Sequence, residues 1–177
     1  MIVVDTRLQP RQRLRAIGIG SLCWFLAGCQ YDPWAGRFLT NRPAERDVVG
    51  TYRVDSDTLT RGVSIPMSSE RVSISRDAEI VLSADHRAQY LHVPEIDMST
   101  TKTCVITGTG SWQQGRNDDY VVVNVEIQRK DYRESADPCG PTYHGQLMLY
   151  GKSPPYKLHI TIGDPDSGDA VQFEKTN

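Results

Sequence analysis

An alternating stretch in the second half of the chain sets the main constraint on the fold. Residues 120–128 have the sequence Tyr-Val-Val-Val-Asn-Val-Glu-Ile-Gln, with an apolar side chain at every odd-numbered position from 121 to 127. The even-numbered neighbours Asn124, Glu126 and Gln128 are polar. A period of two is the period of a β-strand, and this alternation is typical of an antiparallel strand with one buried and one wet face. The stretch therefore predicts a strand packed on a core by one side only.

Further short segments have strand composition, and turn residues such as Asp85-His86-Arg87 separate most of them. Their close spacing favours sequential antiparallel neighbours, hence a meander. A sheet with about nine strands in so small a domain has to curl, and closure removes its unpaired edges. We therefore predict an all-β fold, an up-and-down antiparallel meander barrel of about eight strands, with a two-sheet β-sandwich as the alternative. The predicted strands are Val48–Val54, Arg71–Ser75, Glu79–Ser83, Gln89–Val93, Thr103–Gln113, Tyr120–Gln128, His144–Tyr150, Tyr156–Ile162 and Ala170–Glu174.

Two local features refine this prediction. In the segment 156–162 the alternation places Tyr156, Leu158, Ile160 and Ile162 inward and Lys157, His159 and Thr161 outward. A short N-terminal helical turn is expected over Arg42–Asp47, capped by Asn41, with Pro43 in its first turn. A second single turn is expected over Ser56–Arg61, before Gly62.

The N-terminal segment has the layout of a secretory signal. Four arginines between positions 7 and 15 precede an apolar run, Ala16–Ala27, that is too short to cross a bilayer as a helix, which needs ~20 residues. The run ends in Leu26-Ala27-Gly28-Cys29, and this resembles the lipobox of bacterial lipoproteins. The resemblance implies cleavage between Gly28 and Cys29 and acylation of Cys29, so that the protein is held on a membrane by lipid. The alternatives are an ordinary apolar N-terminal helix or a plain secretory signal.

The same resemblance predicts the location and the domain boundaries. In Gram-negative lipoproteins an Asp after the lipidated Cys favours inner-membrane retention, whereas Gln30 stands here, which implies the outer membrane, facing the periplasm. We expect residues 1–28 to be removed, 29–41 to form a lipidated tether and 42–177 to form a single β-barrel domain. Removing residues 1–28, with four Arg and one Asp, takes the net charge from −2 to −5. A mildly acidic domain does not suit nucleic acid, so no nucleic-acid partner is expected.

Cysteine usage fits export. Cys23 leaves with the leader and Cys29 is acylated, which leaves Cys104 and Cys139 to pair in an oxidising compartment. Two free or catalytic thiols are the alternative. The chain contains no Cys-x-x-Cys, so neither a thioredoxin-like site nor a cysteine-based zinc site is indicated.

Three short motifs carry a resemblance to a known class of domain. They are Val49-Gly50-Thr51-Tyr52, Gly110-Ser111-Trp112 and the ending Ile162-Gly-Asp-Pro-Asp-Ser-Gly168 followed by Phe173-Glu-Lys175. With the meander between them they resemble small lipocalin-like domains of bacterial lipoproteins. The resemblance implies a barrel that binds within its interior or at its mouth, and it brings no catalytic residues.

Catalytic and metal motifs are weak. Asp164, Asp166 and Asp169 do not follow the EF-hand spacing, and a tight hairpin accounts for them better. The histidines 86, 92, 144 and 159 show no local clamp spacing, although His92 and His144 could meet across neighbouring strands. No Gly-x-Ser-x-Gly is present. We expect no metal, no cofactor and no enzymatic activity; a hydrolase built from distant carboxylates is the remaining catalytic alternative.

Aromatic side chains give the remaining candidate site. Tyr52, Tyr90 and Trp112 could line a pocket for a small apolar ligand, or they could fill the barrel interior. The expected function is that of a membrane-anchored envelope lipoprotein and non-catalytic binding module, engaging an unknown small apolar ligand or an envelope protein. The alternative is a structural, immunity or inhibitor-type lipoprotein that acts through a protein partner.

Overall fold

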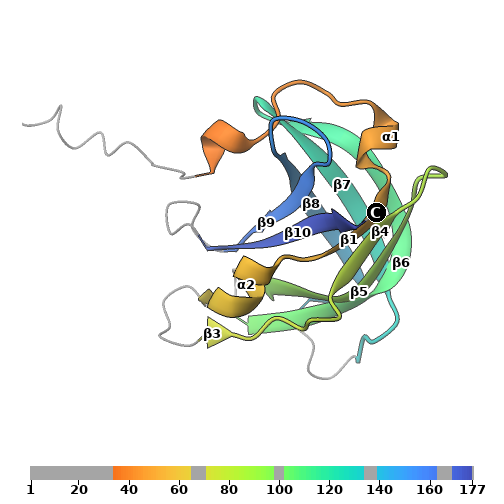
Figure 1. The fold of residues 1–177 in the computed structure, drawn as a ribbon. Helices are drawn as coiled ribbons and strands as arrows, with labels where there is room; N and C mark the ends of the chain where they lie inside the picture. Colours follow the sequence, from red (N-terminus) through yellow and green to blue (C-terminus); the bar gives the residue numbers. More distant parts are fainter. Residues whose placement is uncertain (1–33, 65–70, 98–101, 134–138, 163–168, 177) are drawn as a thin grey trace, which may run out of the picture. The chain divides into compact units, whose positions relative to one another are not determined.

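The computed structural model describes residues 34–64, 71–97, 102–133, 139–162 and 169–176. Within these ranges, eight antiparallel strands form a closed barrel in the order β1-β10-β9-β8-β7-β6-β5-β4 (Figure 1). The strands are β1 Gly50–Val54, β4 Glu79–Leu82, β5 Arg87–Asp97, β6 Lys102–Asn117, β7 Tyr120–Arg129, β8 Thr142–Tyr150, β9 Lys157–Thr161 and β10 Ala170–Thr176. The predicted meander barrel is confirmed, and the two-sheet sandwich is wrong. None of the described helices is long and apolar enough to cross a membrane.

Strand β1 closes the barrel because it pairs on both sides. Thr51 lies opposite Thr176 of β10 and also opposite Val81 of β4. Closure leaves the wall without a free edge. An eight-stranded barrel has an interior that side chains can just fill, and fully buried side chains do fill this one. The largest are Tyr52, Tyr90, Phe173, Ile80, Leu82, Ile106, Ile127, Leu147, Leu149 and Leu158.

Strands β5 and β6 are longer than their predicted segments. The pairing of β5 with β6 shifts register between Tyr90 and Val93, where His92 has a positive φ of 50°. This bulge lets β5 continue to Asp97 after its apolar alternation has ended. Strand β6 continues to Asn117 because it pairs with β7 along that half. The two backbones approach so closely that a Cβ on Gly110 would collide with the carbonyl oxygen of Glu126.

One predicted strand is not part of the barrel. We expected Arg71–Ser75 in the meander, but β3 (Arg71–Val72) pairs with β2 (Val63–Ser64) in a separate two-stranded sheet. The chain leaves the wall after β1 and returns at β4, and the described residues of this excursion, 55–64 and 71–78, pack at one end of the barrel. Its apolar residues Val63 and Ile74 are buried in the same core cluster as the barrel interior. They therefore close that end instead of extending the sheet.

The two helical turns differ in how well the sequence predicts them. Helix α2 (Ser56–Arg61) has the predicted bounds, and Asp55 caps it by accepting a 2.7 Å hydrogen bond from Thr58 N. Helix α1 (Glu45–Val48) begins later than predicted, and Ala44 takes the N-cap position instead of Asn41. A residue that precedes proline is driven away from helical backbone, which keeps Arg42 out of the helix.

The segment before α1 lies on the barrel wall. We call residues 34–44 the strap; it begins with the 3-10 turn η2 (Ala35–Arg37). Leu39 inserts between the ends of β7 and β8, donating to Leu149 O (3.0 Å) and accepting from Val121 N (2.7 Å). Phe38 forms a β-bridge with Tyr150. The described part of the segment that we expected to be a tether, residues 34–41, is therefore an integral part of the barrel.

His159 shows the effect of the strap on burial. The predicted alternation of β9 holds, since Leu158 and Ile160 lie in the core. The expectation of a wet His159 is wrong, because this side chain is fully buried. The rings of Phe38 and Trp34 lie 5.0 and 5.3 Å from its ring. The strap thus covers an outward-facing polar residue that alternation alone assigns to solvent.

We predict that Phe38→Ala lowers the free energy of unfolding by about 3 kcal/mol, because it removes a buried aromatic ring and leaves a gap beneath the strap. Urea titration followed by circular dichroism measures this change. Val105→Ala is the matched control, since Val105 is 47% exposed and its truncation should cost no more than about 0.5 kcal/mol. Equal effects of the two substitutions would contradict the packing of the strap.

Candidate functional site

The three aromatic residues predicted to line a ligand pocket lie in the packed core. Tyr52, Tyr90 and Trp112 are 0%, 1% and 2% exposed. Tyr52 donates its hydroxyl to Val48 O, and Trp112 donates Nε1–H to Ser83 O at 2.9 Å. A void of about 10 Å³ between the excursion and the wall is no larger than one water molecule needs. The described part of the interior is filled, and these three side chains are among those that fill it.

A polar group that the sequence did not reveal lies at one side of this core. Tyr143 of β8 donates a 2.6 Å hydrogen bond to Glu95 Oε2, and its ring lies 6.0 Å from that of Tyr90. The Tyr90 hydroxyl is buried and has no hydrogen-bond partner among the described residues. Burial first, and then the charge of Glu95, raises the pKa of both Tyr90 and Tyr143 well above 10. Alternation could not indicate this group, because Glu95 follows the β5 bulge.

We predict that at least three of the eight tyrosines stay protonated near pH 10 in the folded protein. Burial raises the pKa of Tyr52, and burial with Glu95 raises those of Tyr90 and Tyr143. The unfolded chain releases these protons above about pH 10, so the contribution of these groups to stability is fully present below that pH and is lost as the pH rises above it. Phenolate absorbance during an alkaline titration, with and without urea, measures both effects. Ionisation of all eight tyrosines in one step before unfolding would contradict the prediction.

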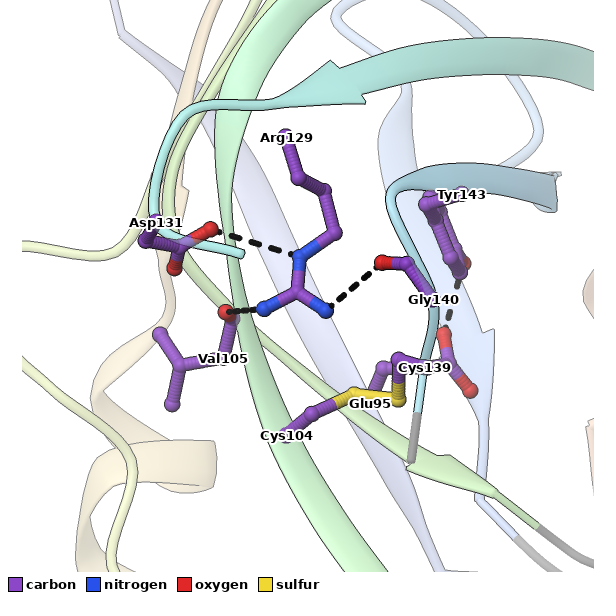
Figure 2. Close-up of a disulfide and its surroundings, with 8 residues drawn as sticks. All are labelled: Glu95, Cys104, Val105, Arg129, Asp131, Cys139, Gly140 and Tyr143. Atoms are coloured by element: carbon purple, nitrogen blue, oxygen red, sulfur yellow. Dashed lines mark hydrogen bonds and ion pairs between the residues drawn. A yellow bond between two sulfur atoms is a disulfide. The ribbon is translucent and has the colours of Figure 1, made fainter. Parts of the chain in front are cut away.

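The predicted disulfide between Cys104 and Cys139 is present, and Figure 2 shows its surroundings. It joins β6 to the segment before β8. In the chain-entropy model a loop of this length contributes roughly 3–4 kcal/mol of stability. The bond is intramolecular, and the structure therefore does not contain the alternative arrangement of two free or catalytic thiols at these positions.

Arg129 fastens the chain on both sides of the disulfide. Its side chain is 2% exposed and pairs with Asp131 at 3.3 Å. Nη1 donates to Gly140 O (3.0 Å) and Nη2 donates to Val105 O (3.3 Å) (Figure 2). These acceptors belong to the residues that follow Cys139 and Cys104. Arg129 terminates the alternating strand β7, and nothing in its sequence context indicates this role.

An open groove of about 700 Å³ crosses the outer wall over β6, β7 and β8. Two of its polar side chains bond to each other, since Gln146 Nε2 donates to Asn124 Oδ1 (3.0 Å). Asn117, which is outside the lining, donates Nδ2–H to Gln146 Oε1 (3.1 Å). A second hollow, of about 430 Å³, lies over β4, β5 and β6. The lining of the first groove is His86, Ser111, Trp112, Gln113, Asn124, Val125, Glu126, His144, Gly145 and Gln146.

The histidines do not form a metal site in the described part of the chain. His92 is on β5 and His144 on β8, with β6 and β7 between them, so the composite site considered from the sequence does not form. His86 Nδ1 lies 3.2 Å from Glu45 Oε1, and His144 Nδ1 lies 3.9 Å from Glu126 Oε2. Within the described ranges, no group of three His, Cys, Asp or Glu side chains could hold a metal ion.

Two of the predicted sites fall outside the described residues. One is the cleavage and lipidation site at Gly28 and Cys29, and the other is the turn that contains Asp164 and Asp166. Both therefore stay predictions from the sequence.

The described fold defines a class, a small closed antiparallel β-barrel with an intramolecular disulfide. No protein-family model matches the chain, and neither a curated protein nor a solved structure matches it.

Proposed function

We propose that the chain is an exported, lipid-anchored envelope protein whose barrel is a non-catalytic recognition module for a protein partner. The observation that favours a protein partner over a small apolar ligand is the filled interior. Tyr52, Tyr90 and Trp112 occupy the space that a ligand would need. The partner would then bind to the outer wall of the barrel.

The sequence supports the anchor. Leu26-Ala27-Gly28-Cys29 follows a basic segment and an apolar run, and Gln30 at the next position favours sorting to the outer membrane, on its periplasmic side. The disulfide fits an oxidising compartment. Because two of the three cysteines that follow the leader pair with each other, Cys29 is the one left for acylation.

The groove over β6, β7 and β8 is the surface that best suits a partner. Its Asn and Gln side chains offer both donors and acceptors, and they are pre-positioned by the hydrogen bonds that join them. Among the described residues, Val105 is the single large apolar side chain that is strongly exposed. A polar surface of this kind suits a modest, reversible interface. An inhibitor or immunity protein would use the same surface, and the identity of the partner distinguishes those roles.

We predict that Cys29→Ser abolishes incorporation of radiolabelled palmitate and releases the domain from membranes into the soluble fraction. The physical reason is that two or three acyl chains anchor stably, at roughly 0.8 kcal/mol for each buried CH₂, and the variant has none. Cys23→Ser is the matched control, because Cys23 lies within the leader and its loss should leave labelling intact. Label that persists in Cys29→Ser would contradict the anchor.

We predict that a photo-crosslinking amino acid at Gln113, in the groove, yields a discrete protein adduct in intact cells, detected by immunoblot and identified by mass spectrometry. The same residue at Asp57, exposed on α2, is the control and should yield none. Gln146→Ala should reduce the adduct, since it breaks the amide contacts of the groove while changing stability by no more than about 0.5 kcal/mol. No adduct, or the same adducts from both positions, would contradict recognition through the groove.

A further inference from the structure

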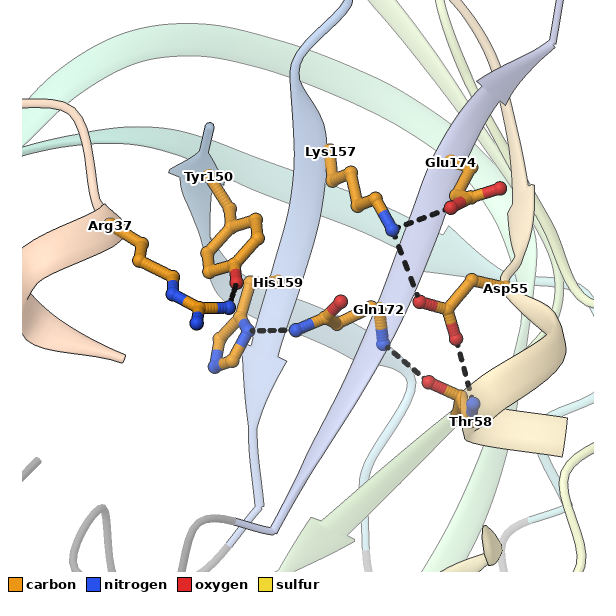
Figure 3. A network of polar contacts seen from close by, with 8 residues as sticks. All are labelled: Arg37, Asp55, Thr58, Tyr150, Lys157, His159, Gln172 and Glu174. Carbon is orange, nitrogen blue, oxygen red and sulfur yellow. Dashed lines mark hydrogen bonds and ion pairs between the residues drawn. The ribbon is translucent and has the colours of Figure 1, made fainter. Parts of the chain in front are cut away.

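The start of the strap is fixed on the wall at β8 and β9. Arg37 Nη1 donates a 2.5 Å hydrogen bond to the Tyr150 hydroxyl, and its guanidinium carbon lies 5.9 Å from the centre of that ring (Figure 3). Trp34 packs edge-on against Tyr150, with 5.9 Å between ring centres. Gly151 N donates to Arg37 O at 3.0 Å. Main-chain and side-chain contacts together therefore hold residues 34–39 at this place.

A polar network beneath the strap ties this place to the rest of the barrel. His159 Nδ1 and Gln172 Nε2 lie 3.5 Å apart, and Gln172 N is held by Thr58 Oγ1 at 3.1 Å (Figure 3). Asp55, which caps α2, also accepts from Lys157 of β9 at 3.5 Å. The wall residues that hold the strap are thus connected by hydrogen bonds to β9, β10 and α2. The strap and the barrel therefore keep one orientation relative to each other.

The distance along the chain from the lipid site to the strap is short. Residues 30–33 alone separate Cys29 from Trp34. Five residue steps span at most about 18 Å even when fully extended. An acylated Cys29 lies at the level of the lipid headgroups, so Trp34 cannot leave the vicinity of the bilayer surface.

We propose that the face formed by Trp34, Arg37 and Tyr150, here called the strap face, rests in the phospholipid headgroup layer. Trp and Tyr are the side chains that favour the membrane–water interface, and a guanidinium binds phosphate oxygens. Lys152, exposed in the turn after β8, adds a cation beside this face. The barrel is held directly on the membrane in one orientation. This inference rests on the proposed lipidation of Cys29.

The two tryptophans that follow Cys29 supply the test. Trp34 is on the strap face, and Trp112 is buried inside the barrel. Purified full-length mature protein, with acylation verified by mass spectrometry, is reconstituted into vesicles of phosphatidylethanolamine and phosphatidylglycerol. A doxyl-labelled phosphatidylcholine, with its spin label near the headgroup, serves as the quencher of tryptophan emission. The Trp34→Phe variant reports Trp112 alone, and its subtraction gives the emission of Trp34.

We expect Trp34 to lose most of its emission and Trp112 to keep its own. No quenching of Trp34 beyond that of Trp112, in verified acylated protein, would overturn the inference while leaving the anchor intact. Absence of acylation would instead contradict the proposed function and would be detected before reconstitution.

A longer tether tests whether the short chain after Cys29 is what holds the strap face on the bilayer. A Gly/Ser insertion of about 20 residues after Gln30 gives a flexible coil with an r.m.s. span of about 25 Å. We expect this insertion to reduce the quenching of Trp34, because the barrel is then free to leave the bilayer surface. Unchanged quenching would overturn the argument that the short chain after Cys29 holds the strap face on the bilayer.

Discussion

The structure depends on the pairing of β1 with both β4 and β10. A sheet of eight strands with a short first strand could have remained open, with β4 and β10 as unpaired edges. Strand β1 instead pairs on both sides, with Thr51, Tyr52 and Arg53 opposite residues of both neighbours, and it brings Val54 opposite Phe173 of the last strand. Closure fixes the barrel diameter, and at eight strands the interior accommodates side chains and little else. The recognition that we propose therefore depends on the outer wall of the barrel and on its ends.

Much of this fold is predictable because it depends on the local alternation of apolar and polar residues. The inward set of β7, at positions 121, 123, 125 and 127, is buried as the sequence predicts. Helix α2 has its predicted bounds because its signals, Asp55 before it and Gly62 after it, act within a few residues. The disulfide could be predicted from the small number of cysteines and from the expectation of export. Each of these inferences needs information from one stretch of chain or from composition.

The features that sequence reasoning missed all depend on contacts between distant segments. Alternation assigns His159 to the outer face correctly, but it cannot indicate that Phe38, more than a hundred residues earlier, covers that face. Segment 34–41 lacks a period because the strap contacts the wall through single residues, with Leu39 hydrogen-bonded on two sides. The bonds of Arg129 beside both cysteines are likewise set by tertiary folding. The candidate site follows the same division: the outward polar residues of the groove were predictable, whereas their convergence into one concavity was not.

The strap and the groove share two strands, and this links the proposed anchor to the proposed recognition surface. The strap is hydrogen-bonded between β7 and β8 at Val121 and Leu149. The groove crosses the same two strands at Asn124 and Gln146. Pairing between these points is unbroken, so the backbone sets the position of the groove relative to the strap. If the strap face rests on the headgroups, as we propose, the groove has a fixed height and tilt above the bilayer. A partner that is itself held on the membrane would then meet this groove with a restricted set of orientations and at a raised effective concentration. The modest affinity of a polar interface would then be sufficient for association, so the proposed recognition suits a membrane-bound partner better than a freely diffusing one.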